Sequence, residues 1–284
     1  MHFSTLPLFH FATATHHSLT LSLSNFLTPA PYPSHFPSRG VNCGRSFIRE
    51  APMEPKDRII VALDVSTLEA ARPLIDALAP HVGLFKVGLE LLTAVGAPAA
   101  VAAVRERGGR VMFDGKFCDI PNTVAGATKA AVALGADLLT VHASAGAESI
   151  RAAVREAGAA KVVGVTVLTS IGESECFEIF GDSPEGKVID FAGTLAKCGA
   201  PAVVCSPREA SLLRHLPLLR ITPGIRPAWA ETGDQKRVLS PGDAVRGGAD
   251  MLVIGRPITK PPAAVGTPAD AARRIADEIA EALA

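Results

Sequence analysis

Eight short runs of apolar and β-branched residues recur along most of the 284-residue chain, and they constrain its fold more than any other feature. Most of the intervals between the runs carry the spacing of an amphipathic helix. Strands that are apolar on both faces and alternate with helices form parallel sheets covered by helices. The runs occupy residues 58–65, 84–88, 110–114, 138–142, 161–168, 202–205, 219–222 and 251–254.

Eight such units in about 230 residues predict a single (β/α)8 barrel, which is an α/β fold. A doubly wound open sheet is the alternative, but no run is followed by the Gly-x-Gly-x-x-Gly turn that binds dinucleotides in such sheets. Signals for helix starts agree with the alternation. Ser66 and Glu69 predict a capping box after the first run, and Thr267 followed by Pro268 predicts the start of the last helix.

The first 52 residues differ in composition from the rest of the chain. Between Met1 and Arg39 there is no Asp, Glu or Lys, but prolines and scattered histidines and serines leave no apolar run of 18 residues, so this segment does not predict a membrane span. The sequence favours a start assigned too far upstream, with Met53 as the natural beginning, and an organellar transit peptide, which has a similar composition, is the alternative. We therefore predict a disordered leader at residues 1–52 and a barrel domain at residues 53–284.

Charge and cysteine content exclude several classes of protein. The chain has 28 basic and 28 acidic residues and an isoelectric point near 7.1, which argues against nucleic acid or an anionic membrane as partner. Its five cysteines form no Cys-x-x-Cys pair. An odd number of cysteines without metal-binding spacing predicts reduced thiols in a cytoplasmic compartment and no structural zinc. An organellar location is the alternative if the leader is a transit peptide.

Charged residues follow several of the apolar runs at the point where the strands end. Active sites of such barrels lie at these carboxyl ends, and buried charges are unfavourable unless they pair or bind a ligand. Asp114 and Lys116 lie on the same side of an extended strand. Lys86, Asp114, Lys116 and Asp119 can alternate in charge within one pocket, where a lysine held charged would serve as a proton donor. A structural ion-pair network at the barrel rim is the alternative.

A second cluster follows the seventh and eighth runs, where barrels commonly bind phosphate. Gly255 allows a close approach of the backbone, and the guanidinium of Arg256 can hold two phosphate oxygens. Arg226 and Gln235 lie in the segment after the seventh run. We interpret this cluster as a phosphate site, with ordinary surface salt bridges as the alternative.

Taken together, the motifs resemble one family, the orotidine 5′-phosphate decarboxylases of the shorter bacterial kind. The resemblance extends from about Lys56 to the C-terminus and covers R-I-I-V-A-L-D, F-K-V-G, F-D-G-K-F-C-D-I-P-N-T-V, V-T-V-L-T-S, T-P-G-I-R, D-Q-K-R-V and V-I-G-R-P-I. It implies that the protein decarboxylates orotidine 5′-monophosphate to UMP and carbon dioxide, the last step of de novo pyrimidine nucleotide synthesis. It also implies that the reaction needs neither a cofactor nor a metal.

The resemblance implies a role for each matching residue. Lys116 would protonate C6 of the pyrimidine, and Asp114 would stand against the substrate carboxylate. Asp119, Ile120 and Thr123 would enter the site of a partner subunit, which makes the enzyme a homodimer with shared active sites. The remaining substrate contacts would come from Asp64 and Lys86 at the ribose, Thr169 or Ser170 at the pyrimidine, Gln235 between base and phosphate, and Arg226, Gly255 and Arg256 at the phosphate.

The chain departs from the family pattern at Gly115, where an apolar residue is usual, and at Cys118, where histidine is frequent. Two other functions remain as alternatives. Mg²⁺-dependent sugar-phosphate decarboxylases and synthases of the same barrel superfamily share D-x-K-x-x-D, but they have an acidic residue in place of Lys86, and a lysine there would repel the cation. A non-catalytic barrel that binds a phosphorylated ligand would be expected to lose part of the lysine–aspartate set, which is complete here.

Overall fold

Eight parallel strands close into a barrel in the computed structural model, which describes residues 53–230 and 239–284. The strands are β1 (Ile59–Ala62), β2 (Leu84–Val87), β3 (Val111–Phe117), β4 (Leu138–His142), β5 (Lys161–Val165), β6 (Ala202–Val204), β7 (Leu219–Thr222) and β8 (Met251–Ile254). Each pairs with its neighbours in chain order, and β1 pairs with β8 to complete the barrel. The predicted (β/α)8 fold is therefore confirmed.

The chain separates into two units, Met1–Ile48 and Arg49–Ala284, and all described residues belong to the second. The leader predicted at residues 1–52 lies outside the described residues, as does Gln235. The assignment of the leader and its boundary at residue 53 thus stay predictions.

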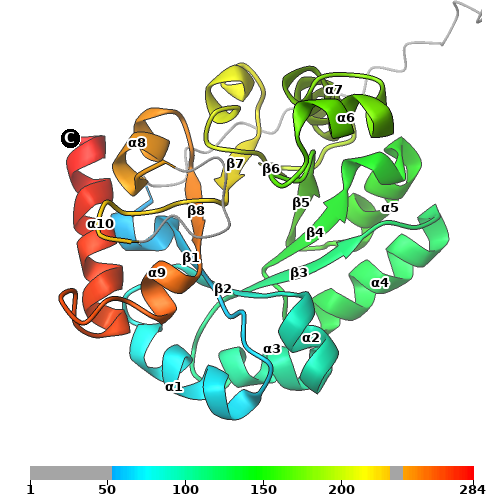
Figure 1. The fold of residues 1–284 in the computed structure, drawn as a ribbon. Helices are drawn as coiled ribbons and strands as arrows, with labels where there is room; N and C mark the ends of the chain where they lie inside the picture. The colour runs from blue at the N-terminus through cyan, green and yellow to red at the C-terminus, as the bar shows by residue number, and fades with distance from the viewer. Residues whose placement is uncertain (1–52, 231–238) are drawn as a thin grey trace, which may run out of the picture. The chain divides into compact units, whose positions relative to one another are not determined.

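Helices alternate with the strands and surround the barrel (Figure 1). The α-helices are α1 (Leu68–Leu78), α2 (Leu89–Val95), α3 (Ala97–Arg105), α4 (Pro121–Leu134), α5 (Ala147–Glu156), α6 (Glu173–Phe180), α7 (Pro184–Lys197), α8 (Pro241–Arg246), α9 (Arg256–Thr259) and α10 (Pro268–Leu283). The short 3-10 helices are η1 (Pro55–Arg58), η2 (Ala143–Ala145) and η3 (Ala210–Leu213). None of the helices within residues 53–230 and 239–284 has the length and apolar character that crossing a bilayer requires.

A cluster of buried apolar side chains lies inside the barrel, and every strand contributes one of them. The cluster consists of Ile60, Leu84, Met112, Leu138, Val163, Ala202, Ile221 and Met251. Residues at alternate positions of the same strands point outward and form a second, larger core with the helices. This division explains why each strand is apolar on both faces, as the runs in the sequence predicted.

Close packing of α7 on β5 depends on the absence of a side chain at Gly164. A β-carbon on Gly164 would lie 2.1 Å from each methyl carbon of Leu195, far inside contact distance. Val188, Ala192 and Leu195 on this face of α7 are fully buried. The glycine therefore lets the helix approach the barrel wall and seal this part of the core.

Local signals for helix starts were correct for α10 and wrong for α1. Thr267 and Asp270 form a reciprocal capping box at the start of α10, with Pro268 in its first turn. At the start of α1, however, the cap is Thr67, whose hydroxyl accepts a hydrogen bond from the backbone N–H of Ala70. The predicted box between Ser66 and Glu69 is wrong because the helix begins one residue later, where alanine has no side chain to complete a box.

Candidate active site

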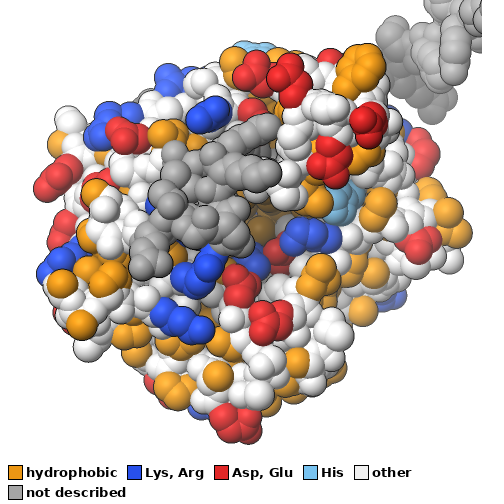
Figure 2. Space-filling model, in the orientation of Figure 1, with side chains coloured by type: hydrophobic (Ala, Val, Ile, Leu, Met, Phe, Trp, Pro, Cys, Tyr) orange, Lys and Arg blue, Asp and Glu red, His pale blue; other side chains and the backbone are white. Residues whose placement is uncertain are grey.

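A cavity of about 370 Å³ opens at the carboxyl ends of the strands. This volume lies within the range of sites that bind small molecules. Figure 2 shows acidic and basic side chains side by side around a hollow in this face of the molecule. Charged lining residues are Asp64 after β1, Lys86 in β2, Asp114 and Lys116 in β3, Arg226 after β7 and Arg256 after β8.

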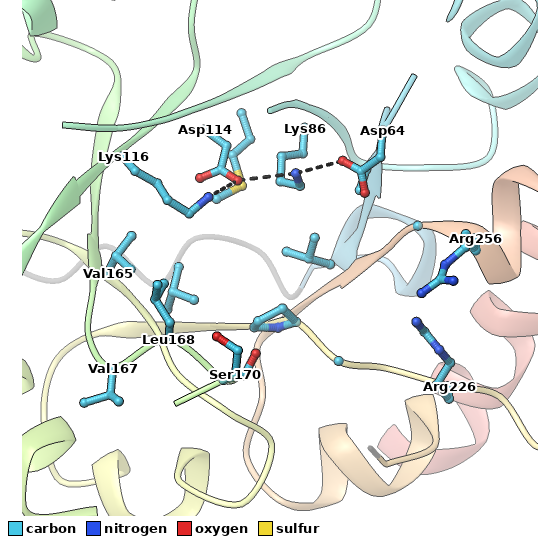
Figure 3. A pocket seen from close by; sticks show the side chains of 18 residues that line it. Asp64, Lys86, Asp114, Lys116, Val165, Val167, Leu168, Ser170, Arg226 and Arg256 are labelled. Carbon is cyan, nitrogen blue, oxygen red and sulfur yellow. Dashed lines mark hydrogen bonds and ion pairs between the residues drawn. The ribbon is translucent and has the colours of Figure 1, made fainter. Parts of the chain in front are cut away.

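Four of these side chains form a line of alternating charge across the cavity (Figure 3). The ammonium of Lys86 lies 3.3 Å from Oδ1 of Asp64 and 3.3 Å from Oδ2 of Asp114. The ammonium of Lys116 lies 2.7 Å from the same Oδ2 of Asp114. The predicted alternation of lysine and aspartate is therefore present, but within this chain Asp64 rather than Asp119 is the second acidic member.

Asp114 is the innermost member of the line, and its side chain is only 9% exposed. Burial alone would raise the pKa of its carboxyl group, but Lys86 and Lys116 together lower that pKa below its usual value. Hydrogen bonds from Lys116 and from the hydroxyl of Thr140 act in the same direction. Asp114 is therefore ionised at neutral pH and places a fixed negative charge inside the cavity.

Asp114 and Lys116 share the cavity, as predicted, but regular alternation along a strand is not the reason. The pairing of β3 with β4 shifts register between Phe113 and Phe117. Lys116 has a φ of +49°, and it is the only residue other than glycine with positive φ among those the structure describes. A left-handed conformation at a residue with a β-carbon costs roughly 1–2 kcal/mol. The surrounding contacts therefore hold the lysine in a conformation that the isolated strand would avoid.

Gly115, one of the two departures from the family pattern, lies within this irregular segment. A β-carbon there would lie 2.7 Å from Cε1 of Phe113 and 3.0 Å from Cε1 of Phe117. The two aromatic rings instead contact each other, with their centroids 5.8 Å apart. The rings thus occupy the space that a larger side chain at Gly115 would need.

Two arginines mark the opposite end of the cavity from Lys116 (Figure 3). Partial burial, together with repulsion from Arg256, lowers the pKa of the Arg226 guanidinium. The Nη1 atom of Arg226 donates a hydrogen bond to the backbone carbonyl of Ile225, at 3.0 Å. Two cationic groups that repel each other are stabilised by an anion that carries two charges, such as a phosphate monoester. Gly224 and Gly255 line the cavity beside them.

The other candidate residues divide into two groups. Thr169 and Ser170 line the cavity together with the apolar side chains of Val165, Val167 and Leu168. Three candidates at the start of α4 are not part of this lining and are exposed: Asp119, Ile120 and Thr123. The backbone there is held by a hydrogen bond from the Ser149 hydroxyl to the carbonyl of Asp119, at 2.8 Å.

His142 ends β4 and is half-buried. Burial and repulsion from Lys116 lower the pKa of its imidazole below the ordinary 6.5, and Asp114 only partly opposes this effect. The imidazole is therefore neutral at neutral pH and adds no positive charge beside Lys116.

Thr140 is the site residue that sequence reasoning missed. Its side chain is fully buried in β4, and its hydroxyl contacts both Asp114 and the backbone of Lys116. The available signal was a single polar residue inside the apolar run at residues 138–142. Nothing in that run indicated that the hydroxyl would meet the neighbouring strand at its irregular segment.

The fold and the cavity together define a (β/α)8 barrel enzyme with a lysine–aspartate line at one end of its site and an arginine pair at the other. The sequence profile of the family described as "Orotidine 5'-phosphate decarboxylase / HUMPS family" matches residues 57–275. The chain therefore belongs to that family.

Individual relatives agree with this assignment over nearly their whole lengths. Orotidine 5'-phosphate decarboxylase of Moorella thermoacetica is 48% identical over 241 residues, which cover 80% of this chain and 94% of the relative. The enzyme of the same name from Anaeromyxobacter sp. (strain K) is 49% identical over 230 residues, covering 79% of this chain and 99% of the relative. Among solved structures, orotidine 5'-phosphate decarboxylase from Lactobacillus acidophilus is similar with a TM-score of 0.66 and 32% identity, covering 78% of this chain and 98% of that one.

Proposed function

We propose that the protein decarboxylates orotidine 5′-monophosphate to UMP and carbon dioxide, the last step of de novo pyrimidine nucleotide synthesis. The observation that carries the proposal is the ion pair between the buried Asp114 and the partly exposed Lys116, 2.7 Å apart, in a cavity whose other end holds two arginines. A nucleotide with a carboxylate on its base and a phosphate on its ribose matches both ends of this cavity. Family membership supports the same substrate.

In this reaction the bond between C6 and the carboxylate breaks, and its electron pair stays on C6 in the plane of the ring. No π system can accept that pair, so the protein must stabilise the charge directly. The fixed ammonium of Lys116 does so and then transfers a proton to C6. Asp114, held ionised by its two lysine neighbours, lies against the substrate carboxylate, and this repulsion is relieved as carbon dioxide leaves. These steps require no cofactor.

The remaining candidates bind parts of the substrate that do not react. Binding energy from the distant phosphate can be used to orient the base and assemble the site. We assign the ribose hydroxyls to Asp64 and Lys86, the pyrimidine amide to Thr169 or Ser170, the bridge between base and phosphate to Gln235, and the phosphate to Arg226, Gly255 and Arg256.

A Mg²⁺-dependent reaction on a sugar phosphate is the alternative within the same barrel superfamily. Its cation would need a site among the carboxylates of the cavity. Here the ammonium of Lys86 lies 3.3 Å from the carboxylates of both Asp64 and Asp114 and occupies the space between them. A divalent cation at that point would be repelled by the lysine, which supports the nucleotide reaction.

The proposal is tested by adding orotidine 5′-monophosphate to protein freed of metal with EDTA. We expect the ultraviolet absorbance of the orotate ring to fall as UMP forms. Folded protein that binds the nucleotide without any change in absorbance would instead indicate a binding barrel. Turnover of a sugar phosphate alone, and only with Mg²⁺, would indicate the alternative enzyme.

We further propose that the enzyme is a homodimer in which Asp119, Ile120 and Thr123 contribute to the partner's site. Their exposure supports this, because Ile120 is 67% exposed and yet lies at the start of α4, beside the end of β3 that carries Lys116. An apolar side chain this exposed is stabilised when a second subunit covers it.

Mixing two inactive variants tests the shared site. Lys116→Ala and Asp119→Ala subunits are each expected to be inactive as homodimers. A mixed dimer, however, contains one site with an intact lysine and an intact aspartate, so an equal mixture should recover about a quarter of wild-type activity. Recovery requires exchange of subunits, so co-expressed variants are compared with variants purified separately. A co-expressed pair that forms mixed dimers without regaining activity would contradict the shared site.

We place the enzyme in the cytoplasm. A nucleotide monophosphate carries two or more negative charges and does not cross a bilayer unaided, so the enzyme and the reactions that supply its substrate share a compartment. If residues 1–52 act as a transit peptide, that compartment is an organelle. N-terminal sequencing of the native protein distinguishes the two.

A further inference from the structure

The segment that carries the catalytic pair is a bulge with an unusual count of residues. In the ladder between β3 and β4, Phe113 pairs with Leu139 and Phe117 pairs with Val141. A regular parallel ladder would place one residue between these pairs on each strand. Here β4 has a single residue in the interval, Thr140, while β3 has three, Asp114, Gly115 and Lys116. Two extra residues are thus accommodated opposite Thr140, and bulges of this kind redirect the side chains they contain.

The hydroxyl of Thr140 connects the two charged residues of the bulge. It accepts a hydrogen bond from the backbone N–H of Lys116, at 2.8 Å, and donates one to Oδ1 of Asp114, at 3.1 Å. A hydroxyl has one proton to donate, and here that proton is directed to the carboxylate. The other carboxylate oxygen, Oδ2, receives Lys116 at 2.7 Å and Lys86 at 3.3 Å. The Thr140 hydroxyl therefore contacts the backbone of Lys116 and the side chain of Asp114.

The backbone conformation of Lys116 depends on its hydrogen bond with the Thr140 hydroxyl. Its φ of +49° is unfavourable for a residue with a β-carbon, and such a conformation persists only where neighbouring groups hold it. The backbone N–H of Lys116 is held by a side chain, Thr140, that is itself fully buried. Without the hydroxyl, that N–H would lose its acceptor and Oδ1 of Asp114 would lose a donor.

We propose that Thr140 is a positioning residue that sets the aim of Lys116. It holds the left-handed turn at the lysine backbone and fixes the plane of the Asp114 carboxylate, so that the ammonium is directed at the reacting carbon. Thr140 is not among the residues that line the cavity, so it acts through Asp114 and Lys116 rather than by touching the substrate. This inference rests on the proposed function, because the aim of the ammonium matters only if it transfers the proton.

The test compares four forms of the full chain: wild type, Thr140→Val, Thr140→Ser and Thr128→Val. Valine retains the branched shape of threonine and removes the hydroxyl. We expect Thr140→Val to lower kcat about 100-fold, because a displacement of roughly 1 Å at the reacting group has an effect of that size. The Kd for UMP, measured by calorimetry, should stay within about threefold of wild type, since the phosphate and ribose contacts are untouched. Thr140→Ser keeps the hydroxyl and should recover most of the lost kcat.

Thr128→Val is the matched control. Thr128 is also fully buried, but its hydroxyl has no hydrogen-bond partner among the described residues. Its replacement should leave kcat unchanged and so exclude a general effect of replacing a buried threonine. Amide hydrogen exchange gives a readout independent of activity. The Lys116 amide should exchange faster in Thr140→Val than in wild type, because its acceptor has been removed.

Three results would overturn the inference. The first is a kcat of Thr140→Val that stays near the wild-type value. The second is a kcat of Thr140→Val that falls only in proportion to its loss of affinity for UMP. The third applies if Thr140→Val does not fold: Thr140→Ser is then compared with Thr140→Ala, and equal kcat values for these two variants would overturn the inference. Wild-type protein that fails to decarboxylate orotidine 5′-monophosphate contradicts the proposed function itself, which the same assay establishes first.

Discussion

Replacing Lys116 by alanine is expected to abolish turnover while nucleotide binding remains measurable. The variant loses both the positive charge that stabilises the electron pair on C6 and the proton that is transferred to C6. General acid catalysis contributes about 10²–10⁴-fold and a preorganised charge about 10²–10³-fold, so we expect kcat to fall by at least ~10⁴-fold. The arginine pair at the other end of the cavity is intact in this variant, so UMP should still bind. Single-turnover absorbance and calorimetry measure the two effects separately.

Lys197→Ala is the control for this experiment, because Lys197 is an exposed residue in the last turn of α7 and does not line the cavity. It should behave as wild type in both measurements. The pKa of Asp114 should rise in Lys116→Ala, since one of the two ammoniums that lower it has been removed. Turnover close to that of wild type in Lys116→Ala would show that another group donates the proton, and the assignment of the reaction to this pair would be wrong.

Replacing Arg256 by alanine is expected to lower kcat/KM for orotidine 5′-monophosphate by about 10²–10⁴-fold. A guanidinium that binds two phosphate oxygens makes two charge-assisted hydrogen bonds, and each contributes about 1.5–3 kcal/mol. Because the phosphate is remote from C6, part of its binding energy is used to assemble the site, so kcat should fall together with affinity. Steady-state kinetics over a wide range of substrate concentrations gives both constants.

The nucleoside orotidine, which lacks the phosphate, provides the decisive comparison. Wild type and Arg256→Ala should process orotidine at similar, low rates, because orotidine has no phosphate for Arg256 to contact. Arg273→Ala is the control, since Arg273 pairs with Asp270 on α10 at 2.6 Å, away from the cavity lining. If Arg256→Ala slowed orotidine and its nucleotide by the same factor, Arg256 would serve the base or the fold rather than the phosphate.

The barrel could be predicted from the sequence because the signals for it are local. A strand buried on both faces requires apolar residues at successive positions, and an outer helix requires an apolar stripe, so both are visible within short windows. The ends of the strands could not be predicted as well as their number and order. β3 continues through Asp114 and Lys116 to Phe117, although these charges interrupt the apolar run. A strand that carries an active site violates the pattern by which strands are recognised.

Most of the cavity could also be predicted, since the residues that follow parallel strands gather at one end of a barrel. That rule correctly placed Lys86, Asp114, Lys116, Arg226 and Arg256 around one cavity. It could not determine which carboxylate pairs with which ammonium. The pairing depends on how far each side chain extends from its strand. Within this chain, Asp64 rather than Asp119 pairs with Lys86.

The sequence by itself determined the number and order of the strands, the charged groups at their ends and the family to which the chain belongs. Only the tertiary structure decided how Lys116 is aimed, with three residues of β3 set against Thr140 and a left-handed turn at the lysine. The physical reason is that register between two strands is a property of their paired backbones. Asp114 and Thr140 are 26 positions apart in the chain, and no local pattern contains the hydrogen bond between them.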